Sequence, residues 1–75
     1  MLPIIGKELL KEYEIGDLVT WIHDLSIEKV GIVLDIYPKK MGNRKFPFAK
    51  VYIMGEDTHD EKLLANLTKI SSKQN

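Results

Sequence analysis

Asp17-Leu18-Val19-Thr20-Trp21-Ile22-His23 is the stretch that decides the fold class of this chain. β-Branched and aromatic residues dominate it, and these residue types favour extended backbone. Because side chains alternate across a strand, Val19 and Trp21 share one face. Gly16, just before the stretch, is typical of a turn. We therefore predict a strand over residues 17–23 that turns Val19 and Trp21 toward a core.

Two longer strands are predicted further along the chain. Residues 29–37 are rich in Val and Ile, and Gly31 within them indicates a bend. We expect this strand to end at Pro38, because proline cannot donate a hydrogen bond to a ladder. Residues 48–54 alternate apolar and polar side chains in the manner of a half-buried strand, which places Tyr52 on the face away from the core.

The segments between and after these strands read as turns and shorter strands. Residues 39–47 are expected to form a loop that turns at Met41, Gly42 and Asn43. Residues 60–64 and 69–71 are expected to form two short strands, with a tight turn or a single 3₁₀ turn at residues 66–68.

The pattern predicts an all-β fold, a small five-stranded barrel with a short N-terminal helix or turn. We expect residues 1–14 to be an N-terminal extension, residues 15–71 the barrel, and residues 72–75 a frayed tail. Within the extension, residues 6–13 contain good helix formers. The predicted core consists of Val19, Trp21, Val33, Ile36, Val51, Ile53, Leu67 and Ile70.

The composition limits the classes of protein to which this chain can belong. A chain of 75 residues is expected to form one domain, and with no cysteine it has neither a disulfide framework nor a thiolate metal site. No apolar run approaches the roughly 20 residues of a spanning helix, so we expect no membrane partner. Residues 1–5 lack the basic flank and cleavage site of an export signal. A cytoplasmic location is therefore expected.

Charge is balanced overall and segregated locally. The chain has 11 basic and 11 acidic residues, which argues against a dedicated nucleic-acid binder. The net charge is −4 over residues 1–36, +5 over residues 37–50 and −1 over residues 51–75. The middle segment is the one place with a sustained positive field.

The order of these patterns resembles a known group of small barrels. The matching residues are Gly16-Asp17-Leu18-Val19-x-Trp21, Gly31-Ile32-Val33-Leu34-Asp35-Ile36, Ala49-Lys50-Val51-Tyr52-x-x-Gly55 and Leu64-x-x-Leu67-x-x-Ile70. They are similar to SH3-like barrels of the KOW and Tudor group, and more closely to the tiny SH3-like proteins of tailed bacteriophages and marine viruses. Residues 15–71 carry the resemblance. Thr58-His59-Asp60 replaces an aromatic residue of the phage pattern, and the basic segment is longer.

The sequence contains few groups of residues that could support catalysis or bind a metal. His59 lies among four carboxylates, but consecutive residues point in different directions, so we interpret this segment as a solvated acidic turn and expect no metal. His23 and Asp24 could form half of a proton-transfer pair, yet no nucleophile with a suitable context accompanies them. We predict that the protein is not an enzyme and holds no cofactor.

The basic segment over residues 37–50 is the strongest candidate for binding. Its cations could contact phosphates or an acidic protein while its aromatic rings stack on bases, or it could be a solvated mobile loop. The candidate binding residues are Tyr37, Lys39, Lys40, Arg44, Lys45, Phe46, Phe48 and Tyr52.

Two functions of different class follow. The favoured hypothesis is a non-catalytic protein-interaction or assembly module, phage-related or viral, whose partner is another protein or a second copy in a homo-oligomer. The alternative is a KOW-like barrel that binds nucleic acid through residues 37–50.

Overall fold

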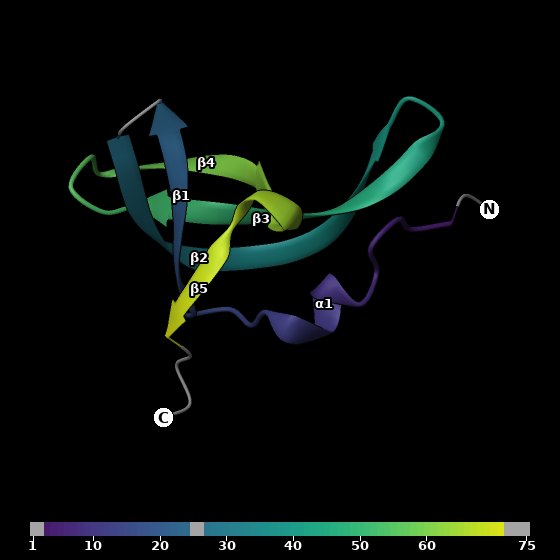
Figure 1. Cartoon of the computed structure of the whole chain (residues 1–75), viewed down its shortest axis with the longest axis horizontal. Coiled ribbons are helices and arrows are strands. Elements are labelled where there is room, and N and C mark those ends of the chain that lie inside the picture. The colour runs from purple at the N-terminus through teal and green to yellow at the C-terminus, as the bar shows by residue number, and fades with distance from the viewer. Residues whose placement is uncertain (1–2, 25–26, 72–75) are drawn as a thin grey trace.

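The computed structural model describes residues 3–24 and 27–71, and in this part of the chain it is a five-stranded antiparallel sheet with one short helix (Figure 1). This confirms the all-β prediction. The predicted tail at residues 72–75 lies outside the described residues. The elements are α1 (Leu9–Glu12), β1 (Leu18–Asp24), β2 (Ile27–Met41), β3 (Arg44–Ile53), β4 (Thr58–Leu63), the 3₁₀ turn η1 (Leu64–Asn66) and β5 (Thr68–Ser71).

The sheet is built around β2, with the strand order β4-β3-β2-β1-β5. The first part of β2 pairs with β1 and the second part with β3, and Gly31 and Ile32 pair with both. The register with β3 shifts between Val33 and Asp35, which is the signature of a β-bulge. Bulges increase the bend of a strand, and Figure 1 shows β2 as a long curved ribbon.

A type II turn fixes the start of β1. Asp17 N donates to the Glu14 carbonyl at 3.1 Å, and Gly16 takes the positive φ of 99° that the third position of such a turn requires. The carboxylate of Asp17 is fully buried; its Oδ2 accepts from Glu14 N at 2.8 Å and lies 3.4 Å from Lys69 Nζ. This buried carboxylate therefore links the turn before β1 to β5.

The core lies on one side of the sheet and agrees with most of the predicted set. Six of the eight predicted residues are buried, and Ile36 is partly buried against them. Ile70 was predicted wrongly, because its side chain is 53% exposed. The pairing of β5 with β1 shifts register between Leu18 and Val19, so Lys69 takes the position opposite Val19 and Ile70 turns outward.

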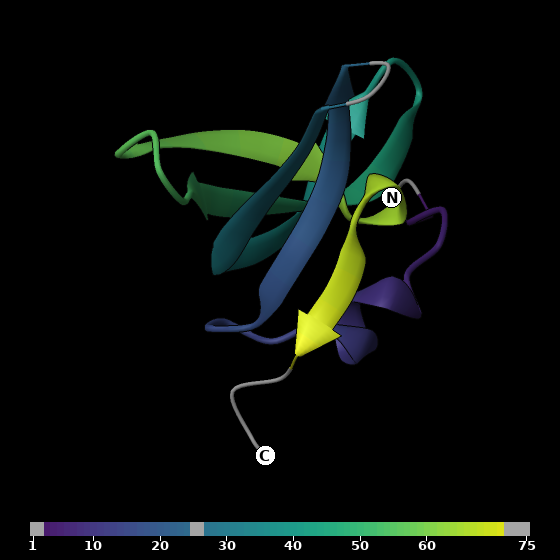
Figure 2. The same ribbon diagram turned by 60° about the vertical axis from the view of Figure 1, so that its left-hand side comes forward.

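The N-terminal segment packs against the core. The predicted helix is confirmed in shorter form as α1, and Leu9 and Leu10 contact the core cluster. Tyr13 is buried, and its hydroxyl donates to the Leu67 carbonyl at 3.0 Å. Figure 2 shows α1 lying on the same side of the molecule as η1 and β5. Residues after α1 are thus tied to the chain just before β5.

Candidate interaction surfaces

The basic segment forms a hairpin, so the prediction of a loop over residues 39–47 was wrong. Strand β2 continues to Met41, β3 begins at Arg44, and only Gly42 and Asn43 form the turn. Gly42 has φ of +63° at the first central position, as a type II′ hairpin turn requires. The predicted position of the turn is therefore confirmed. Its flanks are strands.

Pro38 lies within β2 opposite Pro47 of β3, so the prediction that Pro38 ends the strand was also wrong. Counting back from the two-residue turn, this pair falls at a position where backbone groups point away from the partner strand. Strand β1 pairs with β2 only as far as Ile32, and β4 pairs with β3 only as far as Phe48. The missing N–H groups of the two prolines therefore cost no ladder hydrogen bond.

Strand alternation divides the eight candidate residues between two faces of the sheet. Lys40 pairs with Lys45 on the face shared with the core, because the buried Ala49 lies on that face. We call the opposite side the outer face. The candidates on it are Tyr37, Lys39, Arg44, Phe46, Phe48 and Tyr52.

Glu61 of β4 bonds to two of these candidates. Its carboxylate accepts hydrogen bonds from the Tyr37 hydroxyl and from Lys39 Nζ. Lys39 Nζ also lies 5.4 Å from the centre of the Phe48 ring. The bond to Glu61 raises the pKa of Tyr37 to about 12, and the bonds from Lys39 and then Tyr37 lower the pKa of Glu61. Tyr37 and Lys39 are thus engaged within the protein.

Sequence reasoning missed the role of Glu61. The residue lies opposite Lys50 and two positions from Leu63, the partner of Phe48, so only the β3–β4 register brings it to Tyr37 and Lys39. The sequence offered one signal for this contact: an acidic segment follows the basic strand, and opposite charges on neighbouring strands attract each other.

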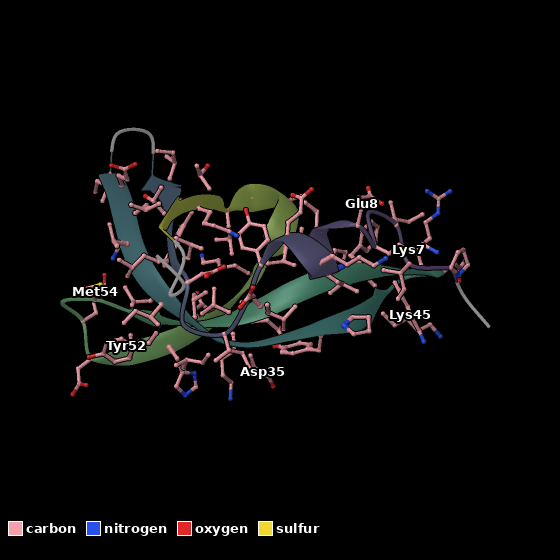
Figure 3. The ribbon with its side chains drawn as sticks, turned by 90° about the horizontal axis from the view of Figure 1, so that it is seen from below. Lys7, Glu8, Asp35, Lys45, Tyr52 and Met54 are labelled. Atoms are coloured by element: carbon pink, nitrogen blue, oxygen red, sulfur yellow. The ribbon has the colours of Figure 1, made fainter. Side chains whose placement is uncertain are left out.

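The outer face of β1, β2 and β3 carries a row of apolar side chains. Leu18, Ile32 and Tyr52 follow one another across the three strands, and His59 of β4 ends the row. Tyr52 is half-buried, and its hydroxyl donates to Asp57 Oδ1 at 3.2 Å. Figure 3 shows Tyr52 on the lower side of the sheet, where Asp35 also lies.

Further apolar side chains extend this row on both sides. Ile22 follows Thr20 on this face of β1 and is 65% exposed, Val30 of β2 lies opposite Thr20, and Ile70 of β5 lies next to Leu18. We call this surface the apolar outer face. It consists of Leu18, Ile22, Val30, Ile32, Tyr52 and Ile70.

The far end of the hairpin carries unpaired cations. Lys40 and Lys45 lie directly opposite each other, and Arg44 is exposed beside the turn. Ile5 N donates to the Lys45 carbonyl at 2.8 Å, which brings the N-terminal segment with Lys7 to this end (Figure 3). Among residues 3–24 and 27–71, these four cations form no ion pair. We call this group the cationic end.

The remaining candidates are not assembled into a site in the part of the chain that the structure describes. His59 lies on β4, and no three potential metal ligands come together among the described residues. The side chains of His23 and Asp24 lie outside what the structure describes. No pocket opens on the described surface. The helix that is described is too short to span a membrane.

Comparison of the chain with protein-family models, with curated proteins and with solved structures finds no match.

Proposed function

We propose that this protein is a non-catalytic assembly module of the SH3-like, phage-related kind, and that it associates with a second copy of itself through the apolar outer face. The support for an SH3-like barrel is the antiparallel order of the five strands, the bend of β2 at its bulge, and the pairing of β1 with β5. This pairing joins the first strand of the chain to the last.

The observation that carries the proposal is the exposure of large apolar side chains on one face of the sheet. Ile22 and Ile70 are each more than half exposed, and they flank the row formed by Leu18, Ile32 and Tyr52. Single exposed apolar residues are ordinary on protein surfaces, whereas a contiguous group marks an interaction site. The N-terminal segment does not cover this group, since Leu9 and Leu10 pack against the core.

A second copy fits this face better than a charged partner does. A two-fold interface places the same patch against itself, so any net charge on the patch would repel its own copy. Among the described side chains that point outward between Ile22 and Ile32, Glu28 is the charged one, and it lies directly opposite Ile22. A standard interface buries about 800 Å² per partner. That is a modest part of the 5233 Å² surface of this chain.

Light scattering and sedimentation across a concentration series test the proposal. We expect a concentration-dependent dimer for the wild type and a monomer for Ile22→Glu, because a carboxylate at this position would be desolvated in the interface. Met41→Glu is the matched control, since Met41 is 46% exposed beside the turn of the hairpin, nine residues along β2 from Ile32 of the patch. It should leave association unchanged.

Circular dichroism of both variants establishes that they remain folded. A wild type that stays monomeric up to about 1 mM would overturn the proposal. A dimer that survives both Ile22→Glu and Ile70→Glu would show that the chain associates through another surface.

A further inference from the structure

Two lysines of the hairpin lie where their like charges destabilise the pairing of the strands. Lys40 and Lys45 are direct cross-strand partners one step from the turn. Like charges in this position destabilise a sheet, because the two Cβ atoms lie only about 4.5–5.5 Å apart. No described acid forms an ion pair with either lysine. Lys39, by contrast, has Glu61 as its partner on the outer face.

Two further cations belong to the same end. Arg44 is exposed and lies on the opposite face of the ribbon from Lys40 and Lys45. Arg44 directly precedes Lys45 in β3, and consecutive side chains in a strand point to opposite faces. The backbone bond from Ile5 to Lys45 holds the N-terminal segment alongside β3, and Figure 3 shows Lys7 near Lys45. Glu8 is also close in this view, but it forms no ion pair among the described residues.

The acidic groups of the sheet lie elsewhere. Glu56 pairs with Lys29, and Asp57 bonds to Tyr52, at the end of β3 farthest from the hairpin turn. Glu61 lies closer to the hairpin, but it pairs with Lys39 and not with these four cations. The cationic end therefore keeps its positive field even though the whole chain has a formal net charge of zero. Fields of this kind attract a polyanion.

We propose that the cationic end, formed by Lys7, Lys40, Arg44 and Lys45, binds the phosphate backbones of a DNA duplex. Beyond the reach of β1 and β4, the hairpin is a two-stranded ribbon that extends from the sheet (Figure 1), flanked at Lys45 by residues 4–5. The major groove of B-DNA admits a two-stranded ribbon. Cations on both faces of such a ribbon contact the two backbones that border the groove.

A single strand is a less suitable ligand for this hairpin. Binding of single strands relies on aromatic rings that are free to stack on bases. Here the hydroxyl of Tyr37 is bonded to Glu61, and Phe48 is buried beneath Lys39. Phe46, opposite Lys39, is partly exposed, but one ring offers a single stacking position. The other residues that remain available are cations, which contact phosphates and carry no sequence information. Binding should therefore be independent of sequence.

Fluorescence anisotropy with a labelled duplex oligonucleotide tests the proposal. Four phosphate contacts predict a slope of log K against log salt of about −3.6, from about −0.9 per contact. Lys40→Gln with Lys45→Gln should reduce the slope to about −1.8 and weaken binding on the order of 50-fold at about 0.1 M salt. Lys29→Gln with Lys50→Gln changes the net charge equally at other places on the sheet and should leave the slope near the wild-type value.

Two competing ligands complete the experiment. Tighter binding to a single-stranded oligonucleotide than to the duplex would overturn the proposal in favour of base stacking. Equal competition by poly-glutamate would overturn it in favour of an acidic protein surface. No binding to the duplex at tens of micromolar protein in low salt would also overturn it, because non-specific affinity is typically about 10⁻⁴–10⁻⁶ M even at physiological salt.

One variant separates binding from a purely structural role of the lysines. Lys40→Glu replaces the repulsion across the ladder with an attraction to Lys45, so it should raise the thermal unfolding midpoint while it abolishes duplex binding. A variant that is more stable and binds the duplex as well as the wild type would contradict the proposal.

Discussion

The indole ring of Trp21 lies against Gly31 of the neighbouring strand, so closely that a Cβ atom on Gly31 would be 2.9 Å from Cη2 of the ring. The same Cβ would be 2.7 Å from the carbonyl oxygen of Tyr52. Gly31 pairs with Val19, two residues before Trp21, and is one of the two residues of β2 that pair with both β1 and β3. The absence of a side chain at residue 31 thus lets the only tryptophan pack at the centre of the sheet.

Gly31→Ala should destabilise the protein by about 1–3 kcal/mol, the usual cost of inserting a methyl group into a packed core. Denaturant unfolding followed by Trp21 fluorescence measures this loss. A cost below about 0.5 kcal/mol would mean that the ring and the Tyr52 carbonyl shift without strain.

A double-mutant cycle identifies the source of the cost. Trp21→Phe removes the distal ring atoms that a Cβ on Gly31 would meet, but leaves the Tyr52 carbonyl in place. Gly31→Ala should therefore cost less in the Trp21→Phe background than in the wild type, and the difference measures the contact with the ring.

Local alternation was sufficient to predict the strands and most of the core. Val19 and Trp21, and likewise Val51 and Ile53, share a buried face because side chains in a strand point to opposite sides in turn. The same reasoning failed for Ile70, since a register shift between β1 and β5 reverses the expected side. Such a shift depends on pairing between residues that are about 50 positions apart, which no local pattern encodes.

The sequence predicted most of the residues of the candidate site but not how they are arranged in space. The residues of the basic segment were identified, but the rule that proline ends a strand hid the continuation of β2 past Pro38. The rule applies where both sides of a strand are paired, and here one side is open. Glu61 and Lys7 come from outside the basic segment, so charge counting alone could not show that one neutralises it and the other extends it.

Tyr13→Phe tests the attachment of the N-terminal segment. The substitution removes the hydroxyl that donates to the Leu67 carbonyl and leaves this buried oxygen without that partner, so we expect a loss of about 1 kcal/mol in the free energy of unfolding. Tyr52→Phe is the matched control, because its hydroxyl bonds to Asp57 at the exposed surface and should change stability by less than about 0.5 kcal/mol. Equal losses in the two variants would contradict a special role for Tyr13.

The bond between Tyr37 and Glu61 makes the free energy of unfolding depend on pH in both the alkaline and the acidic range. The pKa of Tyr37 is raised from 10.0 to about 12, so the folded state holds this proton more tightly than the unfolded state. Its contribution is complete below pH 10 and is lost as the pH rises from 10 toward 12. The pKa of Glu61 is lowered from 4.5, so its contribution is complete above pH 4.5 and is lost as the pH falls through the lowered value.

Glu61→Ala should remove both effects, because alanine offers neither the hydrogen-bond acceptor, which is the main cause of the raised pKa of Tyr37, nor the negative charge. The chain has three tyrosines, so a variant with Tyr13→Phe and Tyr52→Phe leaves Tyr37 as the single phenol to titrate. In that background, the tyrosinate absorbance should report a pKa of about 12 for Tyr37 with Glu61 present, and a value closer to 10 in Glu61→Ala. Lys50→Gln serves as the control, since Lys50 lies opposite Glu61 on β3 but forms no ion pair with it among the described residues. If Tyr37 titrates near pH 10 with Glu61 intact, the hydrogen bond is not maintained in solution and Tyr37 is free for contacts with a ligand.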